Sequence, residues 1–380
     1  MRLRDRCVIA LEGLRVGALL LGRGLRHAHP QRLRGESTAV CRAIARGCWN
    51  GHYLMAGRGH LNRFWIRDLA ISLRGLIELG LAPLARRSIR WALPLWERAG
   101  GVTTTIVFHR FPVDIFTYAC DSYPFLLYSL LELGMQREVT RYRAFLQAEA
   151  QRYHDALIDP ATGAVYTDRE FSQTKDTMRF RGTCTAHAMA AWCSRLLDRI
   201  PQLDNPLAPY PLRRTLLERF WTGRYFRNDL HTDPPLCSAD AGYWPFWCGL
   251  VDDPAMLESN LEEQRALGLD VPFPLKYHAR RLPELEVGVQ RWFLPNYQGD
   301  SIWTFFSVGW IELLARVDRA AARAHLRTYE TLLQRYGTWW EVFEPDGSGP
   351  LRGRLGHGAD WGMLWAAQLP GALARLELRR

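Results

Sequence analysis

The sequence predicts an all-α fold, a closed (α/α)6 barrel in which six inner helices are ringed by six outer helices. The first observation is a recurring pattern in which an Asp- or Trp-bearing loop precedes an apolar helix, near residues 68, 121, 184, 244, 300 and 360. The second is the spacing of these starts, roughly sixty residues, which indicates a repeat of helical hairpins. The third is the more polar helix that follows most of them.

Inner helices of such a barrel all run in the same direction. Their preceding loops therefore gather at one end, where the positive ends of the helix dipoles also point. A linear helical solenoid is the alternative, but its repeats are shorter and do not place a long polar loop before each helix. We therefore expect one cup-shaped site at the N-terminal end of the inner helices.

The composition is that of a folded protein with a large core. The chain has 380 residues, 48% hydrophobic and 23% charged, with a formal net charge of +10. Its arginines are scattered among acidic residues and form no basic run, so we expect no nucleic-acid partner. No apolar run reaches the ~18 residues of a membrane span, so we expect no membrane partner either.

The cysteines and histidines carry no metal-binding pattern. The eight cysteines show neither CxxC nor zinc spacing, and residues 7–21 do not make a convincing secretory signal. We therefore expect a reduced, cytoplasmic protein without metal or cofactor. The oligomeric state is not predicted.

The elements follow from local signals. Residues 1–36 are expected to form an N-terminal arm packed on the barrel, and residues 37–380 a single barrel domain, beginning with a helix over 37–49. Asp68 can cap a helix over 69–79, and Gly80 can end it. Pro83 suits the first turn of the next helix, which Gly100 ends.

The rest of the chain continues the alternation of loops and helices. Residues 102–120 are predicted to be a short strand or an extended loop, and residues 164–183 and 268–299 to be long connections. Helices are expected from 121 to 134 and over 136–156, 184–199, 253–267, 301–317 and 319–336, with a helix that ends near 222, a short one from Trp244, and a last one opened by Asp360-Trp361.

A cup lined by tryptophans and carboxylates favours glycoside hydrolysis. The chain has 15 tryptophans, whose flat faces suit sugar rings. Glycoside hydrolysis needs one protonated and one ionised carboxyl group on either side of the bond. Spacing alone does not choose among the candidates, which are Asp68, Asp121, Asp176, Asp240, Asp300, Glu341, Glu344 and Asp360.

A resemblance narrows the choice. The segment Trp65-Ile66-Arg67-Asp68, followed by Ile71 to Leu76, resembles the Arg-Asp segment of the amylo-α-1,6-glucosidase module of glycogen debranching enzyme. It is also similar to that of the neutral/alkaline invertases and glucoamylases, which are six-hairpin glycosidases. Further segments resemble these families in the same order, over about residues 60–370: Cys120 to Ser122, Thr174 to Gly182, Asn296 to Trp303, and Trp340 to Phe343.

The resemblance implies an inverting glycoside hydrolase of an α-glucoside or oligosaccharide, with Asp176 as general acid and Glu341 as general base. It also implies that Arg67 and Asp68 hold the sugar in the cleaved subsite. We expect further contacts with the carbohydrate from Trp65, Asp121, Arg179, Trp244, Asp300 and Trp303.

Some residues depart from the family pattern. Lys175 replaces the Met before the acid, and the Glu that follows the acid segment falls near Ala186 or His187. Lys175, Arg179 and Arg181 would lower the pKa of Asp176 if they pointed at it. Glu344, three residues after Glu341, is the alternative base.

Two other functions stay open on the same barrel. A sugar epimerase, isomerase or lyase would rely on paired histidines, for which His109 and His357 are the candidates. A carbohydrate-binding protein without catalysis would bind sugar tightly and tolerate loss of Asp176.

Overall fold

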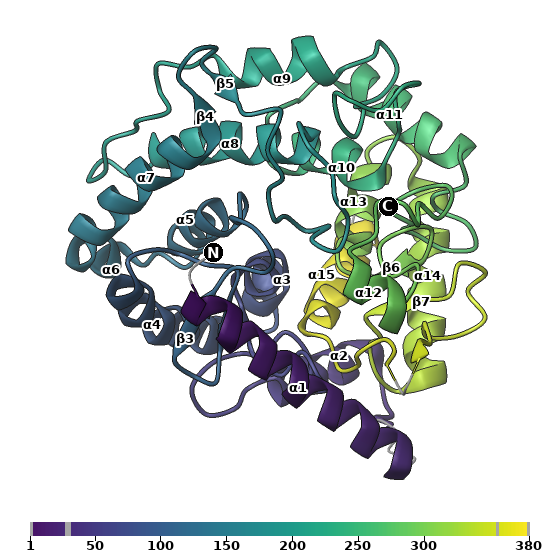
Figure 1. The fold of residues 1–380 in the computed structure, drawn as a ribbon. Coiled ribbons are helices and arrows are strands. Elements are labelled where there is room, and N and C mark those ends of the chain that lie inside the picture. Colours follow the sequence, from purple (N-terminus) through teal and green to yellow (C-terminus); the bar gives the residue numbers. More distant parts are fainter. Residues whose placement is uncertain (1–2, 27–31, 355–356, 378–380) are drawn as a thin grey trace.

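The computed structural model describes residues 3–26, 32–354 and 357–377. In these ranges an inner ring of helices closes on itself, since α3 contacts α5, then α8, α10, α13 and α15 follow in turn, and α15 contacts α3. Figure 1 shows this ring. The inner helices are α3 (Ile66–Glu78), α5 (Ser122–Glu132), α8 (Cys184–Leu197), α10 (Ala239–Trp247), α13 (Ser307–Leu314) and α15 (Gln368–Glu377).

Each inner helix has an outer partner, so the predicted (α/α)6 barrel is confirmed. The outer helices are α4 (Ala82–Ala99), α6 (Gln136–Arg141) with α7 (Arg143–Leu157), α9 (Leu212–Phe220), α11 (Pro254–Ala266), α14 (Arg319–Tyr336) and α2 (Ser37–Gly47). The last pair is formed by opposite ends of the chain, because α2 contacts both α15 and the preceding 3-10 helix η2 (Leu364–Ala367). The ring is therefore closed by two distant segments.

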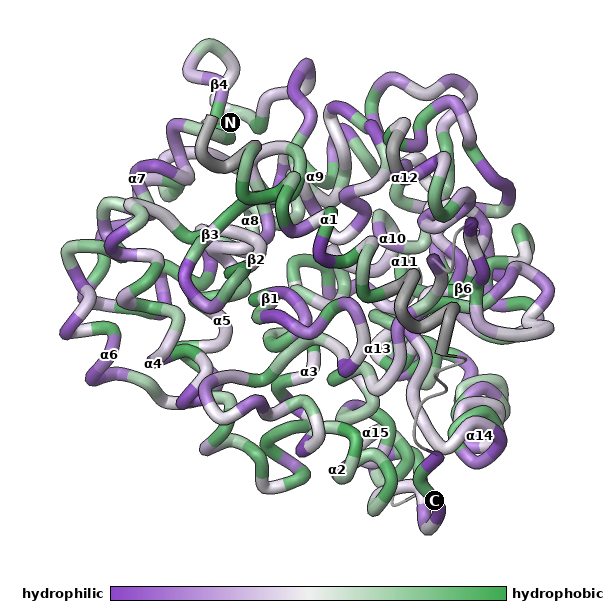
Figure 2. Tube along the Cα trace, turned by 60° about the horizontal axis from the view of Figure 1, so that its bottom comes forward, coloured by the Kyte–Doolittle hydropathy of each residue, from purple (hydrophilic) through white to green (hydrophobic). Residues whose placement is uncertain are grey.

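Burial separates the two rings. Every residue of the inner helix α13 except Glu312 is buried. The outer helix α14 instead buries a stripe with helical spacing, Ala322, Leu326, Tyr329 and Leu333, as expected of an amphipathic helix. In Figure 2, α14 alternates between hydrophilic and hydrophobic colours, whereas α15 is mainly hydrophobic.

The first inner helix begins earlier than predicted. Its N-cap is Trp65, which makes no side-chain capping bond, and Asp68 lies inside the first turn. The prediction that Asp68 caps this helix is therefore wrong, and its carboxylate instead accepts a hydrogen bond from Trp365 Nε1 at 3.0 Å. Gly80 has a φ of 74° just after the helix, which confirms the predicted stop.

Short antiparallel strands lie beside the inner helix N-termini. One sheet joins β1 (Phe64–Trp65), β2 (Thr105–Val107) and β3 (Phe111–Val113), so residues 102–120 are strands joined by loops. A second pair is β4 (Ile158–Asp159) with β5 (Ala164–Val165). A third joins β6 (Ile302–Trp303) to β7 (Val342–Phe343), with Trp303 opposite Val342. This last pair ties the loop before α13 to the segment that follows Glu341.

Three inner helices begin away from their predicted starts. Helices were expected from 244, 300 and 360, but α10 begins at Ala239, α13 at Ser307 and α15 at Gln368. The apolar residues Ile302 and Trp303 pair with β7 as a strand instead of opening a helix. Tertiary pairing overrides local periodicity here.

Helix α1 (Leu3–Arg26) crosses the front of the ring in Figure 1. Val8 of α1 shares a small hydrophobic cluster with Val107 and Val113 of the first sheet. Glu12 of α1 is buried and accepts hydrogen bonds from Arg15 and Arg63. The short helix α12 (Gly288–Phe293) lies in the long connection before α13. Within the described ranges, no helix has the length and apolarity needed to cross a membrane.

Candidate active site

One cavity lies where the loops before the inner helices converge. It spans about 420 Å³ of space, part of which is open to solvent. Its walls combine carboxylates, one arginine and aromatic rings from segments far apart in the sequence. The lining residues are Leu61, Trp65, Arg67, Asp68, Thr174, Asp176, Tyr297, Gln298, Trp303, Phe305, Glu341 and Trp365.

Arg67 connects the first inner helix to two of these loops. It lies in the first turn of α3 and is buried. Its Nη1 donates to Asp176 Oδ2 at 2.9 Å, and its Nη2 donates to Asp121 Oδ1 at 3.1 Å. Asp121 directly precedes α5 and does not line the cavity. It therefore acts on the site only through its hydrogen bond with the Arg67 guanidinium.

Asp176 sits in an environment that favours its protonated form. Burial raises the pKa of Asp176, and the neighbouring Asp121 carboxylate raises it further, while the Arg67 guanidinium opposes both. The basic neighbours in the sequence do not contribute, because Arg179 and Arg181 are exposed. Lys175 turns away and donates to Asp240 at 2.9 Å in a fully buried ion pair.

The loop that carries Asp176 is held on both sides. Gln298 Oε1 accepts from the Thr177 amide at 2.8 Å, and Gln298 Nε2 donates to the Thr174 carbonyl at 2.9 Å. Tyr277 also donates to the Thr174 carbonyl, at 2.9 Å. These bonds fix the backbone of the Asp176 segment against the segment that precedes β6.

Glu341 faces the same cavity and is buried. Its Oε1 accepts a hydrogen bond from the Tyr297 hydroxyl, and its Oε2 accepts one from the Asp360 amide at 2.8 Å. Burial raises the pKa of Glu341 to about 8, helped by the Asp360 and Asp68 carboxylates and opposed by the bond from Tyr297. The two hydrogen bonds fix the direction of the carboxylate.

A third carboxylate and two indoles complete the wall. Burial raises the pKa of Asp68 to about 7. Trp303 donates through Nε1 to the Tyr297 carbonyl, which holds its ring against the cavity. Trp65 lies at the rim, with the Arg63 guanidinium 5.4 Å from its ring centre.

The other expected residues lie elsewhere. Trp244 is fully buried in α10 and packs against Phe125, Tyr243 and Trp247, so it belongs to the core and not to the cavity wall. Arg179 points to solvent, and Asp300 does not line the cavity. Glu344 accepts from the Arg352 amide at 3.0 Å, outside the cavity.

The histidines singled out for other chemistry are separated. The ring of His109 packs 5.6 Å from that of Tyr53, and the ring of His357 packs 4.5 Å from that of Phe293. No histidine is among the described residues that line the cavity. In the same described part of the chain, no three His, Cys, Asp or Glu side chains gather as they would around a metal ion.

Several residues of the site were not singled out from the sequence, among them Tyr297, Gln298 and Trp365. Tyr297 and Gln298 lie inside the segment Asn296 to Trp303, whose resemblance gave the only available signal. Trp365 follows Asp360 by five residues and shows no pattern that separates it from a core tryptophan. Their roles depend on contacts between distant loops.

Comparisons with known proteins agree with this architecture. No family model matches the chain, and no curated protein matches its sequence. Among solved structures, a glycosidase variant in complex with glucose has 15% identity and a TM-score of 0.63, over 90% of this chain and 98% of that one. The GH63 mannosylglycerate hydrolase from Thermus thermophilus, in complex with Tris and D-glycerate, has 14% identity and a TM-score of 0.60, over 90% and 100%.

A further similar structure is the rhamnosidase from Klebsiella oxytoca with rhamnose bound. It has 15% identity and a TM-score of 0.58, over 93% of this chain and 66% of that chain. At such low identity these likenesses show the fold alone. The chain therefore shares the (α/α)6 barrel of these glycosidases.

Proposed function

We propose that the chain is an inverting glycoside hydrolase that acts on an α-glucoside or oligosaccharide. The observation that carries the proposal is that Asp176 and Glu341, from different hairpins, line one cavity with aromatic side chains. The fold shared with solved glycosidases supports the reaction class. The α-glucoside rests on the resemblance of the Arg67-Asp68 segment to debranching enzymes, invertases and glucoamylases.

Asp176 acts as the general acid. Protonated Asp176 gives its proton to the glycosidic oxygen as the bond to the anomeric carbon breaks. Burial and the Asp121 carboxylate keep the pKa of Asp176 above its usual value. Arg67 orients the carboxyl group through its 2.9 Å hydrogen bond.

Glu341 acts as the general base. Ionised Glu341 takes a proton from the water that attacks the anomeric carbon from the opposite face, which inverts its configuration. Tyr297 and the Asp360 amide orient the carboxylate for this transfer. In an inverting pair the two carboxyl groups are roughly 6.5–9.5 Å apart, which leaves room for the water.

The remaining lining residues hold the sugar. Asp68 and Arg67 provide hydrogen-bonding groups for hydroxyls, while Trp65, Trp303 and Phe305 provide apolar surface for the sugar's C–H faces. In this proposal the catalytic domain is residues 37–380, because α2 begins at Ser37 and completes the ring with α15. Residues 1–36 are an arm on it.

A reducing-sugar screen tests the proposal. The full chain is incubated with maltose, isomaltose, maltotriose, sucrose, trehalose and glucosylglycerate, and proton NMR follows the first anomer released from any substrate that turns over. Turnover with release of the inverted β-anomer is the expected result. Turnover with retention contradicts the inverting mechanism, and no turnover on any sugar contradicts the proposed substrate class.

Activated substrates separate the two roles. A glycosyl fluoride needs little help from an acid, because fluoride leaves without prior protonation. Asp176→Asn is therefore expected to keep activity on the fluoride and lose it on the natural linkage, whereas Glu341→Gln loses both. The reverse pattern would assign the acid to Glu341, whose pKa of about 8 favours protonation at neutral pH.

A further inference from the structure

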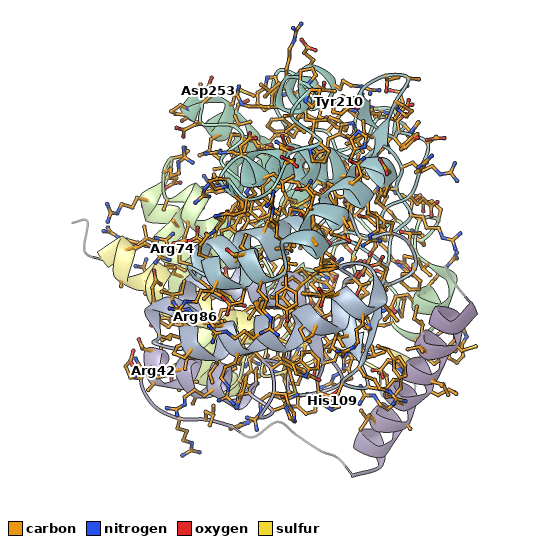
Figure 3. The ribbon with its side chains drawn as sticks, turned by 90° about the vertical axis from the view of Figure 1, so that its left-hand side faces the viewer. Arg42, Arg74, Arg86, His109, Tyr210 and Asp253 are labelled. Carbon is orange, nitrogen blue, oxygen red and sulfur yellow. The ribbon has the colours of Figure 1, made fainter. Side chains whose placement is uncertain are left out.

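A second cavity lies at the other end of the barrel. Residues from all six inner helices line it, including Gly75 of α3, Tyr128 of α5, Trp192 of α8, Trp247 of α10 and Gly309 of α13. It spans about 1730 Å³ of space, against about 420 Å³ at the candidate active site, and both volumes include space open to solvent. In Figure 3, Arg74, which lines it, lies at the end of the molecule opposite α1.

The wall of this cavity, which we call the arginine hollow, carries a strong positive charge. Glu312 is the one acidic residue among its described lining residues, against six arginines. The floor is aromatic, with Tyr128 and Trp247 partly exposed beside the buried Trp192. The arginines are Arg74, Arg195, Arg199, Arg316, Arg319 and Arg375.

Besides Arg316, whose partner is described below, four of these arginines have partners within the chain. Arg375 donates to Glu312 through Nε at 2.6 Å, and Arg74 lies 3.8 Å from the same carboxylate. Arg319 Nη2 donates to the Leu376 carbonyl at 2.7 Å, and Arg195 donates to the Gly249 carbonyl. These contacts neutralise Glu312 and give hydrogen-bond donors to backbone carbonyls near helix ends.

The guanidinium groups of Arg199 and Arg316 remain largely available to bind a ligand. In the part of the chain that the structure describes, the Arg199 side chain makes no hydrogen bond or ion pair, and only its backbone N–H donates, to the Leu196 carbonyl. Arg316 pairs with Asp252 at 3.1 Å, but the Asp252 side chain is 90% exposed, so solvent screens the attraction. Two such guanidinium groups in one hollow match the paired oxygens of phosphates.

We propose that the arginine hollow binds a nucleotide. Its phosphates contact Arg199 and Arg316, with Arg195 beside them, and its base lies against Tyr128 and Trp247. Flat aromatic rings favour a planar base, and guanidinium groups favour phosphate over a neutral sugar hydroxyl. The site is separate from the carboxylate cavity and does not depend on the proposed glycosidase activity.

Isothermal titration calorimetry of the full chain with ATP and with tripolyphosphate tests this. ATP is expected to bind at least tenfold more tightly than tripolyphosphate, and Arg199→Ala with Arg316→Ala is expected to weaken ATP binding at least tenfold. Arg214→Ala is the matched control, since Arg214 has a 77% exposed side chain on α9 and does not line the hollow. Asp176→Asn should bind ATP as the wild type does.

Three results would overturn the proposal. They are no ATP binding at millimolar concentration, unchanged binding in the double arginine variant, and equal affinity for tripolyphosphate. Equal affinity would mean that the aromatic floor adds nothing and that the ligand is not a nucleotide. Because Arg199 and Arg316 are exposed, their alanine variants should unfold at the wild-type temperature, so lost binding reports on the hollow.

Discussion

Arg67 donates to Asp176 across 109 positions of sequence, with 2.9 Å between Nη1 and Oδ2. The residue in the first turn of α3 thereby holds the side chain proposed as general acid. The same guanidinium holds Asp121 at 3.1 Å, so one buried cation serves the buried Asp121 carboxylate and the Asp176 carboxylate, whose side chain is 12% exposed. This cluster links the first turn of α3 to the loops before α5 and α8.

Removing Arg67 is expected to destabilise the fold as well as the site. Arg67→Leu leaves Asp121 and Asp176 buried without their cation, and breaking a buried pair in this way costs about 3–5 kcal/mol. Urea denaturation at pH 7 measures the loss. Arg74→Leu is the control, since its side chain is 58% exposed and its ion pairs are weak. A loss below ~1 kcal/mol in Arg67→Leu would contradict the role of this cluster.

The pH dependence of hydrolysis should follow Glu341. A general base works only when ionised, so kcat/KM is expected to rise with pH as Glu341 loses its proton near a pKa of about 8. The hydrogen bond from Tyr297 lowers that pKa. Tyr297→Phe should therefore move the rising limb to higher pH. An unchanged rising limb in Tyr297→Phe would show that a group other than Glu341 controls the pH dependence.

Glu341 is also expected to make the folded protein less stable at alkaline pH. Its pKa is raised from 4.5 to about 8, so the folded state holds its proton more tightly than the unfolded state. The favourable contribution is complete below pH 4.5 and is lost as pH rises through 8. Each raised pKa unit corresponds to about 1.4 kcal/mol.

Thermal unfolding across pH 5–8.5 measures this effect. Glu341→Gln removes the titration, so its melting temperature should fall less with rising pH than that of the wild type. Glu344→Gln is the control, because Glu344 lies outside the cavity. Parallel curves for Glu341→Gln and the wild type would contradict the raised pKa.

The contact between α3 and the last hairpin depends on a glycine. A Cβ added at Gly75 would lie 2.0 Å from the Ala367 carbonyl oxygen, so the backbones must separate. Gly75→Ala is expected to cost about 1–3 kcal/mol or more through overpacking, as measured by urea denaturation. At Gly13 of α1 an added Cβ meets nothing within 4 Å, so Gly13→Ala is a control. Equal stability of both variants would contradict this packing.

The fold was predictable because each helical hairpin has a local sequence pattern that recurs along the chain. Apolar helices preceded by Asp- or Trp-bearing loops recur along the chain, and α3, α5 and α8 begin within three residues of their expected starts. The start of α13 was missed because Ile302 and Trp303 form a strand with β7, a pairing that periodicity does not reveal.

The candidate site was predictable only in part. The resemblance selected Arg67, Asp68, Asp176 and Glu341, which the structure gathers in one cavity. Trp244 was expected there as well, but helical spacing cannot distinguish a tryptophan of the core from one that lines a cavity. The link between Glu341 and Tyr297 depends on two loops meeting in space, for which the sequence offers no local signal.

Steady-state hydrolysis by Asp176→Asn and Glu341→Gln, beside the wild type and Glu344→Gln, tests the carboxylate pair most directly. Because general acid and general base catalysis each supply about 10²–10⁴ in rate, kcat should fall by at least ~100-fold in the first two variants. Glu344→Gln should retain wild-type kcat. Near wild-type turnover in either Asp176→Asn or Glu341→Gln would contradict the proposed mechanism.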